Sequence, residues 1–194
     1  MKSFEIRQKF LKFFEDHGHT IVPSTSLIPE GDTNALFSVA GMQQFKPYFS
    51  GVKDPLVDIH PSIMKPLGNV NICNIQKCLR TIDIDLVGDN RHLTMFEMVG
   101  NFSFGGYFKK EMIPLALEFV TKILNIPQDS LKISVFKGDE DIPFDQESYD
   151  IWSSLGIKEG QFMRGNREDN FWGPVGPEGP CGPCSEIHVG ELEI

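Results

Sequence analysis

The sequence predicts an α+β fold with a mainly antiparallel sheet flanked by helices. The expected helices and strands follow one another without the regular alternation that a parallel sheet requires. Two strand-like segments joined by a polar loop indicate an antiparallel hairpin near the middle of the chain. The chain has 194 residues, of which 40% are hydrophobic and 16 are phenylalanine, which suits one domain with a sizeable core.

The first part of the chain is predicted to be a helix followed by short elements. Apolar residues recur at helical spacing over residues 3–16, and Gly18 is suited to end this helix. A short strand is expected at 20–23. The apolar run at 35–39 predicts a second short strand, which leads into a short helix ending at Phe49.

The predicted hairpin occupies residues 70–99. Its first strand is expected at 70–80, where apolar and polar residues alternate, and its second at 92–99. The intervening residues TIDIDLVGDNR contain a Gly-Asp-Asn turn signal at 88–90. The sequence therefore predicts two paired strands with a long polar connection.

The second half begins with the clearest helix, expected at 107–124, where apolar residues recur three and four positions apart. Pro114 lies inside this segment, so the helix either begins near residue 111 or kinks at the proline. Later elements are strands at 131–136 and 185–189, a short helix at 146–155 and a turn-rich loop at 173–183.

Charge and composition exclude several classes of protein. The net charge is −9 and no block of Lys or Arg is present, which argues against non-specific coating of nucleic acid. No run of about 18 apolar residues predicts a membrane span. The first ten residues are charged throughout, unlike a signal peptide, and four cysteines do not make a disulfide scaffold. We therefore expect a cytoplasmic protein.

The hairpin carries residues that could bind a nucleotide. Arg80 ends its first predicted strand, while His92 and Phe96 lie an even number of positions apart on the second and so share a sheet face. A guanidinium can hold a phosphate at two points, and an aromatic ring can stack on a base. The alternative is that Phe96 belongs to the core and Arg80 to a surface ion pair. Spacing alone favours this alternative.

The segment GPEGPCGPCSEIH raises three interpretations of Cys181 and Cys184: a redox dithiol, half of a zinc site, or a tight loop. A redox pair would open a helix, whereas these cysteines lead into a strand. A zinc site needs two more ligands. Cys73 and Cys78 lie five apart on a strand and point to opposite faces, so we expect a tight loop and no zinc.

Four ordered segments match one known family. The segment QKCLRTIDIDLVGDNRHLTMFEMVGNFSFGGYFKK at 76–110 resembles motif 2 of the alanyl-tRNA synthetase family of class II aminoacyl-tRNA synthetases. FLKFFEDHGHTIVPSTSLIP at 10–29 resembles its motif 1. LFSVAGMQQFKPYFSG at 36–51 and NFWGPVGPEGPCGPCSEIH at 170–188 resemble two further segments. The resemblance implies a class II antiparallel sheet flanked by helices.

The resemblance also implies roles for individual residues. Arg80 would bind the α-phosphate of ATP, His92 would face the region of the γ-phosphate, and Phe96 would be the shelf for adenine. Met98 would offer main-chain contacts to the adenine edge. The remaining residues that the resemblance places are Met42 and Trp172 in the alanine pocket, and Asn101 and Glu186 near the site.

The implied reaction is ATP-dependent activation of alanine to alanyl-adenylate, followed by transfer to tRNA(Ala), with Mg²⁺ carried on the ATP phosphates. Residues 1–194 would form the N-terminal part of the catalytic domain, with motifs 1 and 2 present and motif 3 absent, since no G-x-G-x-E-R occurs. The motif 2 loop also lacks a Gly-Gly-Lys-His insertion. Without the later strands we expect self-association through exposed sheet surface. The alternative function is a non-catalytic module that binds ATP or a partner.

Overall fold

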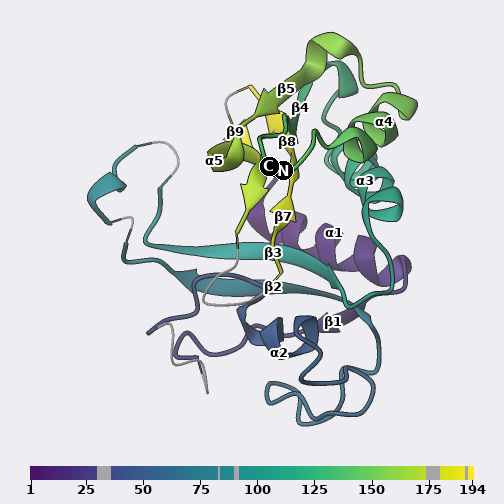
Figure 1. Ribbon diagram of the computed structural model, residues 1–194. Helices are drawn as coiled ribbons and strands as arrows, with labels where there is room; N and C mark the ends of the chain where they lie inside the picture. Colours follow the sequence, from purple (N-terminus) through teal and green to yellow (C-terminus); the bar gives the residue numbers. More distant parts are fainter. Residues whose placement is uncertain (30–35, 83, 90–91, 174–179, 191) are drawn as a thin grey trace. The chain divides into compact units, whose positions relative to one another are not determined.

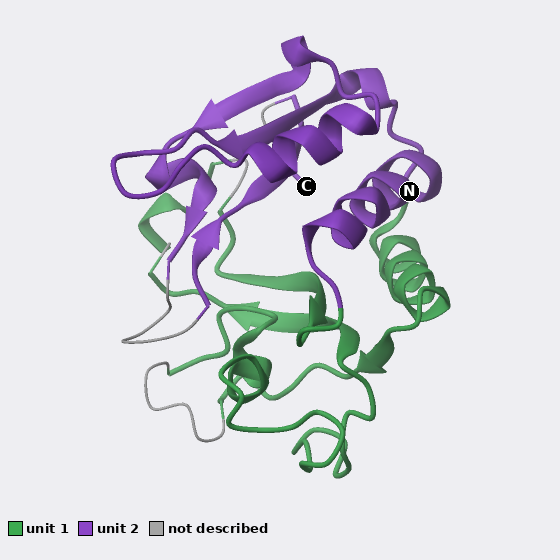
Figure 2. Ribbon diagram, turned by 45° about the vertical axis from the view of Figure 1, so that its right-hand side comes forward, with its two compact units in different colours: residues 1–106 green, residues 107–194 purple. Residues whose placement is uncertain are grey.

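The computed structural model describes residues 1–29, 36–82, 84–89, 92–173, 180–190 and 192–194. The chain forms two compact units, Met1–Gly106 and Tyr107–Ile194, which Figure 2 shows in different colours. Each unit has its own sheet and its own core, and each is described by itself below. A single catalytic domain over 1–194 stays a prediction.

Unit 1 is built on a three-stranded sheet in the order β1-β2-β3 (Figure 1). The helix α1 (Ser3–Asp16) leads into β1 (Thr20–Val22), which pairs in parallel with β2 (Asn71–Leu79). The strand β2 then pairs antiparallel with β3 (Met95–Ser103). The connections contain three short helices, η1 (Gln43–Phe45), α2 (Lys46–Phe49) and η2 (Ile84–Leu86).

The register of β2 against β3 divides their side chains between two faces. Directly opposed residues share a face, so Asn74, Gln76 and Cys78 lie on the same side as Gly100, Met98 and Phe96, respectively. We call this side, from Ile72 and Phe102 to Cys78 and Phe96, the platform face. On the opposite face, Arg7 of α1 forms an ion pair with Glu97 of β3.

One end of the platform face is covered by an aromatic core. Phe45 is fully buried and its ring centroid lies 5.3 Å from that of Phe102. The other buried members of this core are Val22, Tyr48, Leu67 and Ile72. Toward Phe96 the β3 side of the platform face is only half-buried, so this part of the sheet remains accessible.

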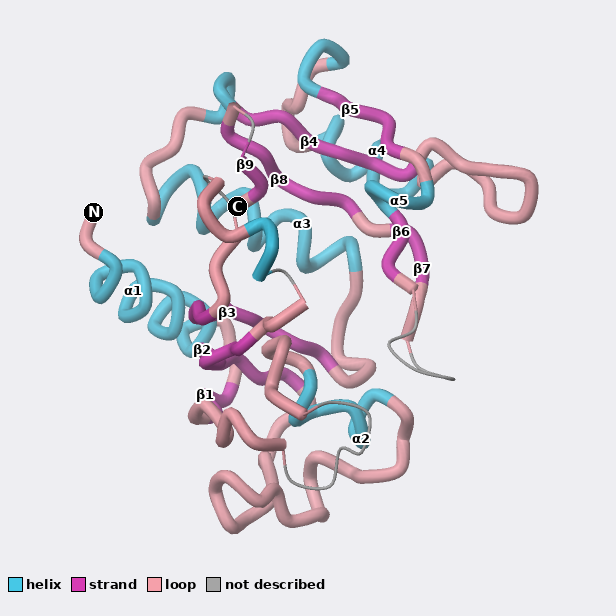
Figure 3. The backbone as a smooth tube through the Cα atoms, turned by 90° about the vertical axis from the view of Figure 1, so that its left-hand side faces the viewer, coloured by secondary structure: helices cyan, strands magenta, loops and turns pink. Residues whose placement is uncertain are grey.

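Unit 2 contains a four-stranded sheet in the order β5-β4-β8-β9. Its strands are β4 (Leu131–Phe136), β5 (Phe162–Gly165), β8 (Ser185–Val189) and β9 (Leu192–Glu193). The pairing of β4 with β5 is parallel and the other pairings are antiparallel. The strands β6 (Phe171–Trp172) and β7 (Gly182–Pro183) form a separate two-stranded ribbon next to α5 (Arg167–Asn170), as Figure 3 shows.

The helices α3 (Lys109–Glu118) and α4 (Gln146–Ser154) cover one face of this sheet (Figure 2). Their buried residues Ile113, Leu117 and Trp152 pack against the apolar side of β4 and β8. The π-helical turn η3 (Phe119–Ile123) extends α3, and the 3-10 turns η4 (Gln128–Ser130) and η5 (Glu159–Gln161) complete the unit. Because side chains alternate along a strand, β4 and β8 present polar residues on their other face.

The α+β class is confirmed, and so are the predicted elements at 3–16, 131–136 and 185–189. The first helix ends before Gly18, whose φ of +80° suits glycine. The helix with Pro114 begins at Lys109, so the proline removes one backbone hydrogen bond from its interior. Among the described residues, no helix is long and apolar enough to cross a membrane.

Two predictions of local structure need correction. The second hairpin strand begins at Met95, not at 92, because pairing with β2 starts there. No strand forms over 36–39, the described part of the run at 35–39. The pairings are mainly antiparallel, as predicted, although β1 and β5 pair in parallel with their neighbours. Asn90 of the predicted turn and residues 174–179 of the predicted loop lie outside the described residues.

Candidate functional site

Arg80 lies one residue beyond β2, and its backbone N–H donates to the carbonyl of Thr94 at 2.8 Å. This bond continues the hairpin by one step and directs the side chain to the platform face. The guanidinium carbon of Arg80 lies 5.1 Å from the centroid of the Phe96 ring. The Nε–H donates to the carbonyl of Val39 at 3.0 Å, which fixes one edge of the guanidinium. The structure therefore brings a cation and an aromatic ring together on one side of the ribbon.

Met98 extends this surface by two residues along β3. It lies on the same face as Phe96 and is half-buried. Its neighbour Gly100 has no room for a side chain, since a Cβ there would lie 2.7 Å from the Phe102 ring. The half-buried Phe96, Met98 and Gly100 thus form a flat apolar strip, beside which a planar group could lie.

Met42 is brought beside this strip by the segment that precedes η1. The backbone N–H of Gly41 donates to the Sδ atom of Met98 at 3.2 Å. Met42 itself is half-buried and directly follows Gly41. The fold therefore places the backbone immediately before Met42 against Met98, although the two segments are far apart in the sequence.

His92 lies in the hairpin connection and not on β3. The alternation that placed it on the face of Phe96 therefore does not extend to it. Its Nδ1 atom lies 2.6 Å from Oδ2 of Asp89, and its backbone N–H donates to the other carboxylate oxygen at 2.7 Å. Asp89 was not among the predicted site residues. An aspartate three positions before a histidine in a turn was the signal available in the sequence.

Asn101 is separated from the strip by the register of the sheet. It is paired with Cys73, on the face opposite to Phe96 and Met98. Cys73 and Cys78 likewise lie on opposite faces of β2, and both are buried. Asn101 therefore lies on the side of the ribbon away from Phe96 and Met98.

Trp172 and Glu186 belong to unit 2. Trp172 is 39% exposed on β6, directly opposite Gly182 of β7. Glu186 lies on the polar face of the unit 2 sheet, where its Oε2 accepts a hydrogen bond from Ser134 Oγ at 3.1 Å. The same oxygen lies 3.4 Å from Nε2 of His188.

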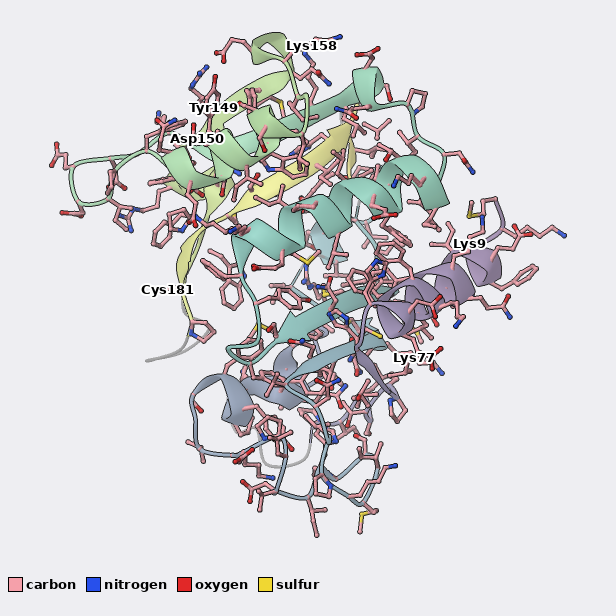
Figure 4. The ribbon with its side chains drawn as sticks, turned by 90° about the vertical axis from the view of Figure 1, so that its right-hand side faces the viewer. Lys9, Lys77, Tyr149, Asp150, Lys158 and Cys181 are labelled. Atoms are coloured by element: carbon pink, nitrogen blue, oxygen red, sulfur yellow. The ribbon has the colours of Figure 1, made fainter. Side chains whose placement is uncertain are left out.

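The cysteine segment is held by Asn170, the last residue of α5. The Asn170 carbonyl accepts from the backbone N–H of Cys184 at 2.9 Å, and its Nδ2 donates to the Cys184 carbonyl at 3.2 Å. Burial, together with the nearby carboxylate of Glu186, raises the pKa of the Cys184 thiol to about 11. A redox cysteine needs a lowered pKa, so this environment opposes a dithiol function. Cys181 is exposed and lies at the far end of the ribbon (Figure 4).

Metal-ligating residue types do not gather in the described part of the chain, where no three His, Cys, Asp or Glu side chains are arranged to hold an ion.

The chain is similar to known proteins over almost its whole length. A family described as "tRNA synthetases class II (A)" matches residues 5–194. A protein named alanine–tRNA ligase from Dehalococcoides mccartyi is 49% identical over 186 residues, which make up 96% of this chain and 19% of the relative.

Two further relatives carry the same name. The one from Fervidobacterium nodosum is 52% identical over 188 residues, or 96% of this chain and 20% of the relative. The one from Borrelia hermsii is 48% identical over 191 residues, or 97% of this chain and 30% of the relative. The chain therefore spans between 19% and 30% of the length of these relatives.

Proposed function

Since the chain belongs to the family of class II tRNA synthetases described above, we propose that the full-length protein activates alanine with ATP and transfers the alanyl group to tRNA(Ala). The β2–β3 ribbon of unit 1 would bind the nucleotide. The observation that carries this proposal is the position of the Arg80 guanidinium over the Phe96 ring, 5.1 Å from its centroid.

The distance between these two groups suggests how ATP would lie. Two stacked contacts at about 3.5 Å each require about 7 Å, so a purine does not fit between the ring and the guanidinium as they stand. We propose that adenine stacks on the other side of Phe96 and that the terminal Nη atoms of Arg80 take the α-phosphate. The bond from Nε to Val39 would hold the guanidinium plane during this contact.

The proposed chemistry requires positioning and positive charge. An oxygen of the alanine carboxylate attacks the α-phosphorus of ATP, the bond to the bridging oxygen breaks, and pyrophosphate leaves with the electron pair. Arg80 would stabilise the charge that develops on the α-phosphate. Magnesium would arrive on the ATP phosphates, and His92 would face the γ-phosphate region of the same nucleotide. Met98 would contribute main-chain contacts to adenine.

Met42 would line the alanine pocket in this proposal, while the roles of Trp172 and Glu186 stay predictions from the sequence. Met42 is large and apolar, which suits exclusion of bulky amino acids. Such a pocket discriminates weakly against glycine and serine, because single small groups contribute little binding energy. As a soluble partner of tRNA(Ala), the protein would act in the cytoplasm.

The test is alanine-dependent exchange of labelled pyrophosphate into ATP by the full-length protein. We expect exchange with alanine, and a loss of about 100-fold or more in kcat on Arg80→Ala, as for other key transition-state contacts. Lys77→Ala is the matched control, because Lys77 is an exposed cation of β2 on the face opposite to Phe96 (Figure 4). ATP binding by calorimetry without any exchange would favour the non-catalytic module.

A further inference from the structure

Both backbone polar groups of Gly41 are bound by side chains of the platform face. Its N–H donates to Met98 Sδ at 3.2 Å, and its carbonyl accepts from Asn74 Nδ2 at 3.4 Å. Asn74 and Met98 come from neighbouring strands, and their side chains lie on the same face. Together they hold the backbone immediately before Met42, and we call them the Gly41 clamp.

Asn74 is an unfavourable residue at this position for the stability of the fold. It is fully buried, and its Oδ1 atom has no hydrogen-bond partner within the described structure. Leaving a buried carbonyl oxygen unpaired is destabilising, because its desolvation is not compensated, whereas an apolar side chain of similar size carries no such cost. Oδ1 lies close to both glycines, 3.6 Å from an ideal Cβ at Gly41 and 3.4 Å from one at Gly100. Asn74 therefore forms its hydrogen bond to Gly41 at the expense of an unpaired oxygen, which lowers the stability of the fold.

We infer that Asn74 is a positioning residue, which acts through Gly41 to set the side chain of Met42 and thereby the selection of the amino acid. This inference rests on the proposed function, since it assigns Met42 to the amino-acid pocket. Arg80 binds the same segment, since its Nε–H donates to the carbonyl of Val39. The platform face therefore holds the segment before Met42 at two points. The Asn74 amide donates its hydrogen bond to Gly41, in the segment before Met42, so its loss should affect the amino acid more than ATP.

The first test is Asn74→Leu in the full-length protein. Leucine keeps the approximate size but removes the donor to Gly41, together with the unpaired oxygen. We expect the KM for alanine to rise about three- to tenfold, as the loss of one hydrogen bond predicts, while the KM for ATP changes less than twofold. The preference for alanine over serine in kcat/KM should fall. Thermal stability should change little, because the unpaired Asn74 oxygen is removed while the Gly41 carbonyl loses its donor.

Met98→Leu removes the other half of the clamp and should move alanine KM in the same direction. Ile75→Val is the matched control, because Ile75 adjoins Asn74 in β2 but lies on the opposite face. Hydrogen–deuterium exchange of residues 36–49 supplies a readout that needs no activity. We expect faster exchange at Gly41 in both clamp variants and unchanged exchange in the control.

Unchanged exchange at Gly41 in Asn74→Leu would overturn the inference. So would faster exchange with unaltered alanine KM and serine discrimination, or an equal loss of affinity for alanine and ATP. Failure of the proposed function is recognised separately, because the unsubstituted protein would then show no alanine-dependent exchange of pyrophosphate. That result would also remove the role of Asn74 in amino-acid selection.

Discussion

A Cβ atom on Gly165 would lie 2.0 Å from the Oδ1 atom of Asn170. Asn170 cannot easily move away, since it is fully buried and its Nδ2 donates to Ser134 Oγ at 2.6 Å. The same residue binds Cys184 and directly precedes the ribbon that carries Trp172. The absence of a side chain at Gly165 therefore allows the packing that orders this ribbon.

Gly165→Ala should destabilise the protein by about 1–3 kcal/mol, the usual cost of overpacking a well-filled site. Urea unfolding followed by circular dichroism would measure the change. Gly160→Ala serves as the control, because a Cβ at Gly160 meets no atom within 4 Å. Equal midpoints for the two variants would show that Asn170 can shift without cost.

The stability of the fold should decrease as the pH falls below about 6.5, because two histidines are buried in their neutral form. Burial lowers the pKa of His19 and of His60 below the ordinary value of 6.5. In the unfolded chain both regain that value and take up protons first, so acid favours unfolding. Each histidine contributes at most about 1.4 kcal/mol per pH unit.

The double variant His19→Gln/His60→Gln should flatten this dependence between pH 7 and pH 5. The pKa of Asp139 is lowered to about 2 by its hydrogen bond from Arg167, so its contribution is lost only in stronger acid. An unaltered slope in the double variant would contradict the assignment to these histidines.

Phe96→Leu should raise the KM for ATP in the full-length protein while leaving the KM for alanine nearly unchanged. A base stacked on an aromatic ring gains about 1–3 kcal/mol, which corresponds to about 5- to 150-fold in affinity. Phe96→Tyr retains the ring and should bind ATP almost normally. If leucine and tyrosine behave alike in steady-state kinetics, Phe96 is not the adenine shelf.

Cys181 should be the first cysteine to react with iodoacetamide in the folded protein, because it is exposed. The thiolate is the reactive form, and burial raises the pKa of Cys73 to about 12 and that of Cys78 above its ordinary value. Cys184, with its pKa near 11, should react at least about tenfold more slowly than Cys181. Mass spectrometry would follow the sites. If a fast phase of labelling persists in Cys181→Ser, this order of cysteine reactivity is wrong.

Elements whose pattern is local could be predicted from the amino-acid sequence. The helix at 3–16 and the strands at 131–136 and 185–189 have the predicted bounds, since apolar periodicity and turn residues specify them without reference to the rest of the chain. The four motifs also identified the family from residues alone. The start of β3 was missed because a strand ends where its partner's hydrogen bonds end, and these depend on register.

How the residues of the candidate site meet depends on the packing of the folded chain. The closeness of Arg80 and Phe96 depends on the step by which the hairpin continues beyond β2, which alternation alone does not give. The same register places Asn101 on the other face. The bond from Asn74 to Gly41 joins residues 33 positions apart. A polar residue in a strand pattern carries no sign of such a contact, because its partner is brought to it only by the packing of the whole unit.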